Sequence, residues 1–245
     1  MSQRRVSHII ARTCIFAGPS LSRLERPEGI DLFPPATRGS IREAVGAGYR
    51  VIGFIDGAVD PKERVSLAEL RDALARRAVR LIGGASMGAI RAVQLDTLGM
   101  LGIGRVFRLF RRGSLSDADE VLVLHAPAAL RFRPLTLPLV NIRYTLQRMR
   151  TAEHITPADE AGVIAHLSDV PWFDRDRQSL SAAVYRTCGS ARSARVVQWF
   201  DRLYRDVKQE DAIGVVSAVR RHMHSSQRSR AIGAVGDRPF AVRRA

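Results

Sequence analysis

The chain has 245 residues, of which 46% are hydrophobic and 26% charged, and its formal net charge is +15. The composition is that of an ordinary folded protein, and the length suits one α/β domain with an appendage or two small domains. No run of about 18 apolar residues is present, so we expect no membrane span. The first eight residues lack a signal-peptide pattern, which favours a cytoplasmic location.

The basic charge is dispersed along the chain. Of the 39 basic residues, Lys62 and Lys208 are the two lysines and the other 37 are arginines. A basic patch with interleaved aromatic residues is absent, so we expect no nucleic-acid partner. A solvated basic surface is the simplest explanation, and docking of an acidic protein is the alternative. The two cysteines, Cys14 and Cys188, lack metal-ligand or disulfide spacing and favour a reducing compartment.

Strand and helix patterns alternate in the first half of the chain. We predict strands over 9–17, 50–56, 79–83 and 121–125, and helices over 40–46, 66–77, 86–98, 105–112 and 139–150. Ser40 and Glu43 are expected to form a capping box, and 31–39 and 99–104 to be loops. This alternation predicts an α/β fold, in which a mostly parallel sheet has flanking helices.

The second half of the chain has helical periodicity and few strand signals. Helices are predicted over 157–167, 180–187, 191–207 and 211–223. We therefore expect three regions: an α/β core over residues 1–150, a helical C-terminal region over residues 151–225, and a mobile basic tail over residues 226–245.

The segment Gly84-Ala-Ser-Met-Gly88 matches the G-x-S-x-G pattern of a strand–turn–helix nucleophile elbow. Ser86 is a candidate nucleophile, and the helix N-terminus beside it can hold an oxyanion, a phosphate or a carboxylate. The alternative is that a small residue simply fits at a tight contact between a helix and a strand.

Residues that are candidates for binding or catalysis follow four predicted strands. They are Gly18 and Ser20, then Asp56, Ser86 and His125. Because sites in parallel sheets collect at the carboxyl ends of strands, we expect these residues to lie on one rim. Asp56 and His125 are candidate catalytic residues beside Ser86, but an Asp-Gly turn and a structural histidine explain them equally simply. A Ser86–Asp119 or Glu120–His125 triad is strained, because its acid and base are close in sequence.

A set of short motifs in order along the chain resembles the TfuA-like core domain over about residues 13–148. The motifs are Gly18-Pro-Ser-Leu21, Pro34-Pro35, Ile55-Asp-Gly57, Gly84-Ala-Ser-Met-Gly-Ala89, Gly99-Met-Leu-Gly-Ile-Gly104, Asp119-Glu-Val121 with His125, and Val140-Asn-Ile-Arg143. The resemblance implies a partner of a YcaO enzyme in backbone thioamidation of a ribosomal peptide or protein. In such systems the TfuA-like member is thought to bind a thiocarboxylated ubiquitin-like sulfur carrier and promote its hydrolysis to sulfide.

Two positions depart from the family pattern. Gln94 stands where an acidic residue is expected, and Ser40 where an aspartate often follows the loop glycine. If that carboxylate takes part in the chemistry, Gln94 favours a non-catalytic adaptor that docks the carrier or substrate onto YcaO. A free-standing α/β serine hydrolase is the third alternative.

Binding residues are expected near these strand ends. The set is Gly18, Ser20, Gly84, Gly88, Arg91, Asp119, Glu120, Asn141 and Arg143. Asn141 and Arg143 would share a face in an extended segment, where they clamp an anion, but not on a helix. We expect no metal, because Asp119 and Glu120 lack nearby ligands, and no nucleotide or other cofactor, because the phosphate-binding glycine motifs are absent.

Overall fold

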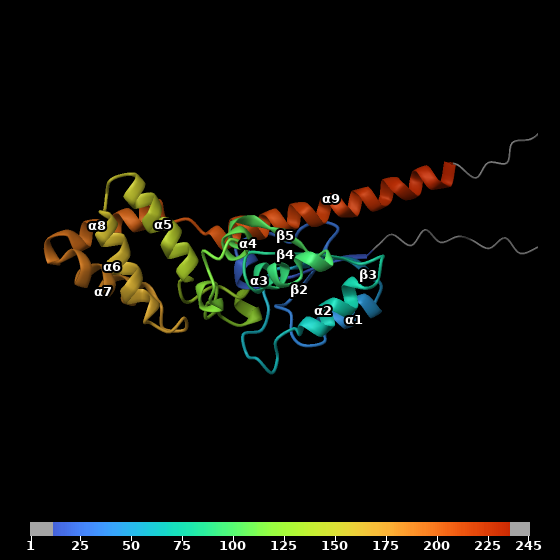
Figure 1. Cartoon of the computed structure of the whole chain (residues 1–245), viewed down its shortest axis with the longest axis horizontal. Coiled ribbons are helices and arrows are strands. Elements are labelled where there is room, and N and C mark those ends of the chain that lie inside the picture. Colours follow the sequence, from blue (N-terminus) through green and yellow to red (C-terminus); the bar gives the residue numbers. More distant parts are fainter. Residues whose placement is uncertain (1–11, 236–245) are drawn as a thin grey trace, which may run out of the picture.

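The structure, a computed structural model, describes residues 12–235, and residues 224–235 by their backbone only. Its centre is a five-stranded parallel sheet in the order β2-β1-β3-β4-β5 (Figure 1). The strands are β1 (Arg12–Phe16), β2 (Asp31–Phe33), β3 (Tyr49–Phe54), β4 (Arg80–Gly84) and β5 (Leu101–Ile103). The predicted α/β class, with flanking helices and a helical C-terminal region, is confirmed.

Both faces of the sheet are buried, because alternate side chains of each strand point to opposite faces. In β1, Cys14 and Phe16 belong to one apolar cluster, and Ile15 belongs to another on the opposite face. The first cluster includes the apolar sides of α1 (Ser40–Gly46), α2 (Leu67–Leu74), α3 (Met87–Gln94) and α4 (Gly104–Arg111).

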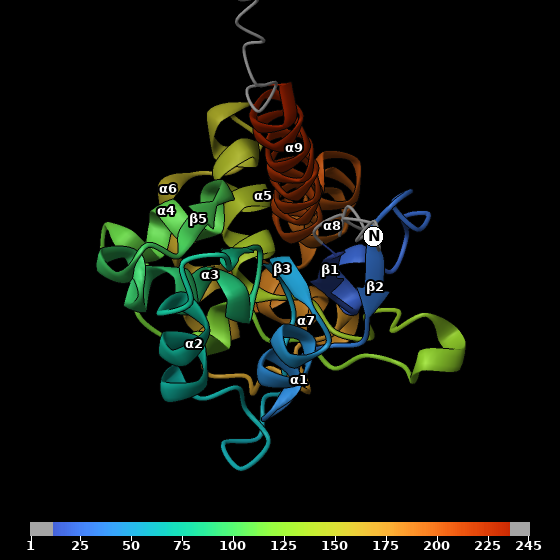
Figure 2. The same cartoon turned by 90° about the vertical axis from the view of Figure 1, so that its right-hand side faces the viewer.

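One long helix, α9 (Val207–Val235), covers the opposite face of the sheet. Ala212, Val215 and Val219 of α9 pack on Ile15, Val51 and Ile82 of the strands. Figure 2 shows α9 on one side of the strands, with α1, α2 and α3 on the other. Among the helices of the described residues, none is both long and apolar enough to span a membrane.

Four helices form a third apolar cluster beside the sheet: α5 (Leu139–Thr151), α6 (Pro157–Ser168), α7 (Arg177–Cys188) and α8 (Ser190–Leu203). Figure 1 shows them gathered at one end of the molecule, with α9 returning from there to the sheet. The predicted region boundaries remain a prediction. The structure adds that α9 is helical through Val235, into the first part of the predicted tail. Residues 236–245 lie outside the described residues.

Several local predictions were wrong. Residues 121–125 form no sheet strand, and His125 makes an isolated bridge to Pro134. The predicted loops contain the short strands β2 and β5. Strands of only three residues give too little periodicity to distinguish them from loops.

The predicted capping box at Ser40 is also absent. Gly39 precedes α1 with a φ of 94° and provides no side-chain cap. The buried carboxylate of Glu69, on α2, instead accepts hydrogen bonds from the amides of Gly39 and Ile41, both at 2.9 Å. A distant residue therefore replaces the local cap, which no local pattern could indicate.

The strand order reverses between β1 and β3, since β2 lies on one side of β1 and β3, β4 and β5 lie on the other. In open parallel sheets the crevice at such a switch point is the usual place for a binding site. The loops that follow β1 and β3 meet there.

Candidate functional site

Asp56 lies at the carboxyl end of β3 and holds the turn that follows β1. Its Oδ2 accepts hydrogen bonds from the amides of Gly18 at 2.9 Å and Ser20 at 3.0 Å. Its Oδ1 accepts a hydrogen bond from the Ser20 hydroxyl at 2.7 Å. Asp56 is 3% exposed and Ser20 4%. The buried carboxylate is therefore fully engaged by donors of a single turn, the short 3-10 helix Pro19–Leu21 and its preceding glycine.

The elbow glycines sit where the backbone of one element meets the backbone of the next. A Cβ on Gly88 would lie 1.7 Å from the carbonyl oxygen of Phe54, in β3. A Cβ on Gly84 would lie 2.7 Å from the carbonyl oxygen of Ile103, in β5. Ala85 takes up the sharp turn with a φ of 65°. Close packing thus accounts for both glycines.

Ser86 is the N-cap residue of α3 and is 5% exposed. Its Oγ donates to the carbonyl oxygen of Val121 at 3.5 Å, the long end of the hydrogen-bond range. Ser86 and Asp56 both lie at the carboxyl edge of the sheet, as predicted for strands that run parallel. This long hydrogen bond is weak, so the Ser86 hydroxyl can exchange Val121 for another partner.

Lys208 brings a second functional group to Ser86. Its Nζ donates to the same carbonyl oxygen of Val121 at 2.5 Å, and the residue is 3% exposed. Burial lowers the pKa of Lys208, and the negative charges of Asp56 and Asp206 oppose this shift. A lysine with a lowered pKa beside a serine hydroxyl is an arrangement used to activate serine nucleophiles.

Asn141, predicted as a binding residue, is hydrogen-bonded to the start of α9 and also lines the cleft beside Lys208. It is 1% exposed in α5. Its Oδ1 accepts a hydrogen bond from the backbone amide of Lys208 at 3.3 Å, and its Nδ2 donates to Asp206 Oδ1 at 3.0 Å. These bonds fix the start of α9, and with it the point at which the Lys208 side chain enters the site.

A cleft of about 250 Å³ lies between the turn after β1, α5 and the start of α9, and Lys208 and Asn141 line it whereas Ser86 does not. Ser20, Asn141, Tyr204 and Lys208 line it together with Arg23 and Arg177. Asp206 is the acidic residue of the lining, so cationic groups outnumber carboxylates. Burial raises the pKa of Tyr204 to about 12, so its hydroxyl remains a neutral donor. The cleft suits the end of an anionic chain.

A model of the TfuA-like protein family matches residues 56–176. These residues belong to the TfuA-like family. The matched segment begins at Asp56 and includes Ser86, Val121 and Asn141, whereas Lys208 lies beyond its end. A search of curated proteins found no significant match. The family suggests a role in YcaO-associated thioamidation systems.

The other predicted residues of the TfuA-like segment do not join Ser86. His125 Nδ1 lies 2.9 Å from the carbonyl oxygen of Ala126, and its ring packs edge-on against Phe132. Within the described residues, no hydrogen bond connects His125 with Ser86. The triad therefore has no support in this arrangement, because its strand was mispredicted and the histidine follows an irregular loop.

The two candidate acids of the triad are paired with arginines. Glu120 accepts hydrogen bonds from Arg143 Nε at 3.0 Å, and Asp119 pairs with the fully buried Arg175. Arg143 and Asn141 have separate partners, as expected for two positions on a helix. These ion pairs tie the segment before α5 to the helical cluster.

Arg91 of the TfuA-like segment lies on α3, and its hydrogen-bond partners among the described residues do not include Asp56 or Ser86. Its Nη1 donates to Gln94 Oε1 at 2.7 Å and its Nη2 to the carbonyl oxygen of Val65 at 3.0 Å. Burial lowers the pKa of Arg91, and the neighbouring charge of Arg64 lowers it further. Gln94 thus pairs with Arg91 as a neutral acceptor.

Lys208 was not predicted as a site residue, although one feature of the composition points to it. It is one of two lysines in a chain with 37 arginines, so a lysine at any position is unusual for this composition. Arginine cannot act as a base, whereas a buried lysine can. In the part of the chain that the structure describes, no group of three or more His, Cys, Asp or Glu side chains is arranged to hold a metal ion.

Proposed function

We propose that this TfuA-like protein binds the thiocarboxylated C-terminal tail of a ubiquitin-like sulfur carrier and hydrolyses it, supplying sulfide to a YcaO partner. The observation that carries the proposal is the buried Lys208, which shares the carbonyl of Val121 with Ser86 and also lines a cationic cleft.

The cleft supports recognition of a chain end. Its volume of about 250 Å³ is below the roughly 300–1,000 Å³ of typical small-molecule sites, so it accommodates the last residues of a tail better than a whole cofactor. A thiocarboxylate carries one negative charge, which Arg23 and Arg177 complement. In this proposal the folded domain of the sulfur carrier remains outside the cleft.

The chemistry requires a nucleophile and a base. Neutral Lys208 takes the proton of the Ser86 hydroxyl as Oγ attacks the thiocarboxylate carbon. The C–S bond then breaks and sulfide leaves with a proton from Lys208 as hydrogen sulfide ion, which leaves an ester on Ser86. Water, deprotonated by Lys208, cleaves this ester to the carrier's carboxylate and restores the serine. The net reaction converts thiocarboxylate and water to carboxylate, hydrogen sulfide ion and a proton. Lys208 releases this proton at the end of the cycle and is neutral again.

The N-terminus of α3 supplies a donor for the oxyanion formed during the attack. The first amides of a helix lack carbonyl partners within it. Of these, Gly88 donates to the carbonyl of Ile55 at 3.0 Å and Ala89 to that of Ser86 at 2.9 Å. The amide of Met87 is the nearest candidate for the oxyanion.

The experiment that tests this proposal mixes the protein with a thiocarboxylated carrier and with the same carrier ending in a carboxylate. We expect sulfide from the first and none from the second, and we expect Ser86→Ala to reduce the rate at least about 100-fold, the contribution of a lost nucleophile. Release of sulfide by Ser86→Ala at the wild-type rate would remove the serine from the mechanism.

A non-catalytic adaptor is the second candidate, and one observation favours it. The carboxylate of Asp56 has all its hydrogen bonds within the fold, and the Ser86 hydroxyl is nearly buried. An adaptor predicts saturable, salt-weakened binding of carrier or YcaO with no sulfide release by the wild-type protein, and equal binding by Ser86→Ala.

A further inference from the structure

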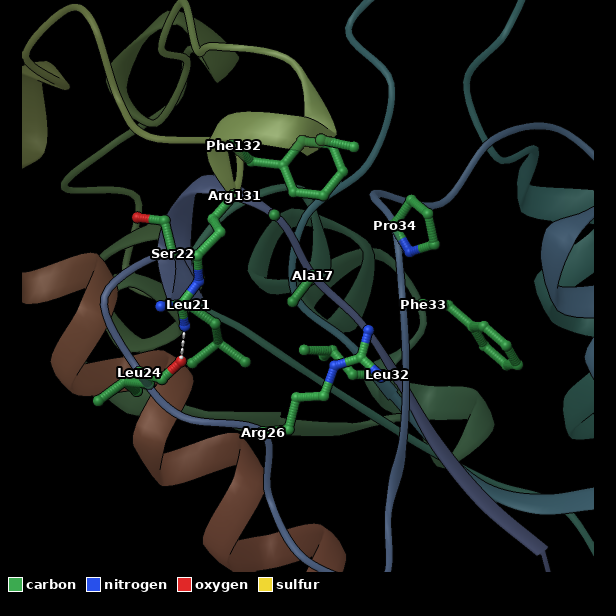
Figure 3. Close-up of a pocket in the computed structure, with 12 residues that line it drawn as sticks. Ala17, Leu21, Ser22, Leu24, Arg26, Leu32, Phe33, Pro34, Arg131 and Phe132 are labelled. Atoms are coloured by element: carbon green, nitrogen blue, oxygen red, sulfur yellow. Dashed lines mark hydrogen bonds between the residues drawn. The ribbon is translucent and has the colours of Figure 1, made fainter.

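A second cavity of about 420 Å³ lies on the other side of the turn that Asp56 holds. Gly18 and Leu21 of that turn line this cavity, whereas Pro19 and Ser20 line the Lys208 cleft. Figure 3 shows it between the end of β1, the end of β2 and the loop that carries Arg131 and Phe132. We refer to it as the Arg131 pocket.

The walls of the Arg131 pocket are mainly apolar. Leu21, Leu24, Leu32, Pro34 and Phe132 contribute to them. Leu32 belongs to β2, an edge strand of the sheet. Apolar walls of this extent recognise hydrophobic groups, and the volume falls within the range of specific ligand sites.

Two arginines give the Arg131 pocket a positive charge. Arg131 Nη2 donates to the carbonyl oxygen of Leu24 at 2.6 Å, which fixes the guanidinium in place. Figure 3 shows Arg26 reaching toward Leu32 from the opposite side. Neither arginine forms an ion pair with a carboxylate among residues 12–235. Two unneutralised guanidinium groups over an apolar cavity favour a carboxylate.

The loop that forms one wall is held in an uncommon conformation. Arg131 and Phe132 both have a φ of 55°, although neither is glycine. This left-handed conformation is unfavourable for residues other than glycine, and such strain is concentrated at binding and catalytic sites. Both strained residues direct their side chains to this pocket, so the strain and the cavity coincide.

We propose that the Arg131 pocket binds the C-terminal end of an apolar peptide segment, with the terminal carboxylate between Arg26 and Arg131. A peptide is favoured over a fatty acid because the outer edge of β2 pairs with no strand of the described residues. An extended peptide can form backbone hydrogen bonds with such an edge, whereas an acyl chain cannot. This site is separate from the Lys208 cleft, and the proposal stands whether or not that cleft releases sulfide.

The test uses the full chain and a fluorescein-labelled peptide, Gly-Ser-Leu-Leu, with either a free carboxylate or a carboxamide end. We expect saturable binding of the acid in fluorescence anisotropy, and at least about tenfold weaker binding of the amide, which is 1.4 kcal/mol. Arg26→Gln and Arg131→Gln should each weaken binding of the acid. Arg112→Gln, at an exposed arginine directly after α4, is the matched control and should bind as wild type does.

Three outcomes would overturn the proposal. One is equal binding of acid and amide, which would show that the arginines do not read the carboxylate. Another is wild-type binding by the Arg26→Gln, Arg131→Gln double variant when its melting temperature is unchanged. The third is displacement of the peptide by decanoate at equal concentration, which would identify a lipid carboxylate as the ligand.

Discussion

Lys208 and Ser86 donate hydrogen bonds to one atom, the carbonyl oxygen of Val121, at 2.5 Å and 3.5 Å. The serine follows β4 and the lysine begins α9, so the long return of α9 to the sheet is what brings them together. The site therefore needs the C-terminal part of the chain as well as the TfuA-like segment.

The first prediction concerns the charge on Lys208. Burial holds its pKa below the ordinary value of 10.5, so the folded state binds this proton less well than the unfolded chain does. Below the folded-state pKa the protonated lysine therefore destabilises the folded protein. This destabilisation decreases as the pH rises from the folded-state pKa to 10.5. Lys208→Met should raise the free energy of unfolding at pH 7 by about 1–4 kcal/mol.

Urea unfolding at several pH values measures this difference. The stability gap between Lys208→Met and wild type should narrow as the pH rises, because wild type regains stability. A stability difference that does not change with pH would show that burial does not lower the pKa of Lys208. A Lys208→Met variant less stable than wild type at neutral pH would show the same.

The second prediction concerns the turn after β1. Asp56→Ala removes the acceptor of two amides and of the Ser20 hydroxyl, all buried. Each buried donor left without a partner costs about 1–3 kcal/mol, so the variant should lose at least about 3 kcal/mol of stability. Asp72→Ala, at an exposed position of α2, is the control and should change stability by less than about 0.5 kcal/mol. Equal melting temperatures for the two variants would contradict this role of Asp56.

The main course of the fold was predictable from local patterns. The buried run at β3 and the amphipathic segments of α2 and α5 have periodicities that identify them without tertiary information. β2 and β5 were missed because three residues carry almost no period. The segment 121–125 was predicted as a strand because it is apolar. Val121 and Val123 are buried although the segment is not part of the sheet, so its composition resembles that of a buried strand.

The candidate site was predictable only in part. Asp56 and Ser86 could be placed at one edge because parallel strands end together. The partners of Asp56 follow from the strand order, which puts β3 beside β1. Lys208 could not be placed, because its position depends on α9 crossing back over the sheet and on the hydrogen bond from its backbone to Asn141. Long-range packing of this kind leaves no local signal.

The third prediction concerns the elbow. Gly88→Ala places a methyl group 1.7 Å from the carbonyl oxygen of Phe54, where the backbone of β3 cannot move without breaking the sheet. The variant should lose more than about 3 kcal/mol or fail to fold, because overpacking against backbone exceeds the usual cost of extra core volume. Gly46→Ala is the control, since no atom lies within 4 Å of its Cβ position. That variant should be unchanged or up to about 1 kcal/mol more stable. Comparable melting temperatures for both variants would contradict the packing explanation.

The fourth prediction concerns sulfur transfer through the protein. Burial raises the pKa of Cys14 to about 12 and that of Cys188 to about 11, so neither thiol ionises at neutral pH. Because the thiolate is the reactive form, we expect no carbamidomethylation of either cysteine by iodoacetamide in the folded protein, and no thioester between either cysteine and the carrier after incubation with thiocarboxylated carrier. Mass spectrometry of the intact chain checks both. A mass increase equal to the carrier's acyl group on either cysteine would indicate that a cysteine, and not Ser86, attacks the thiocarboxylate.

The central claim is that Lys208 activates Ser86 for hydrolysis of a carrier's thiocarboxylate. The most direct measurement is the single-turnover rate of sulfide release by Lys208→Met and by Lys62→Met, the exposed second lysine. The account predicts at least about a 100-fold loss for Lys208→Met, the contribution of a general base, and the wild-type rate for Lys62→Met. Equal rates for the two folded variants would contradict it.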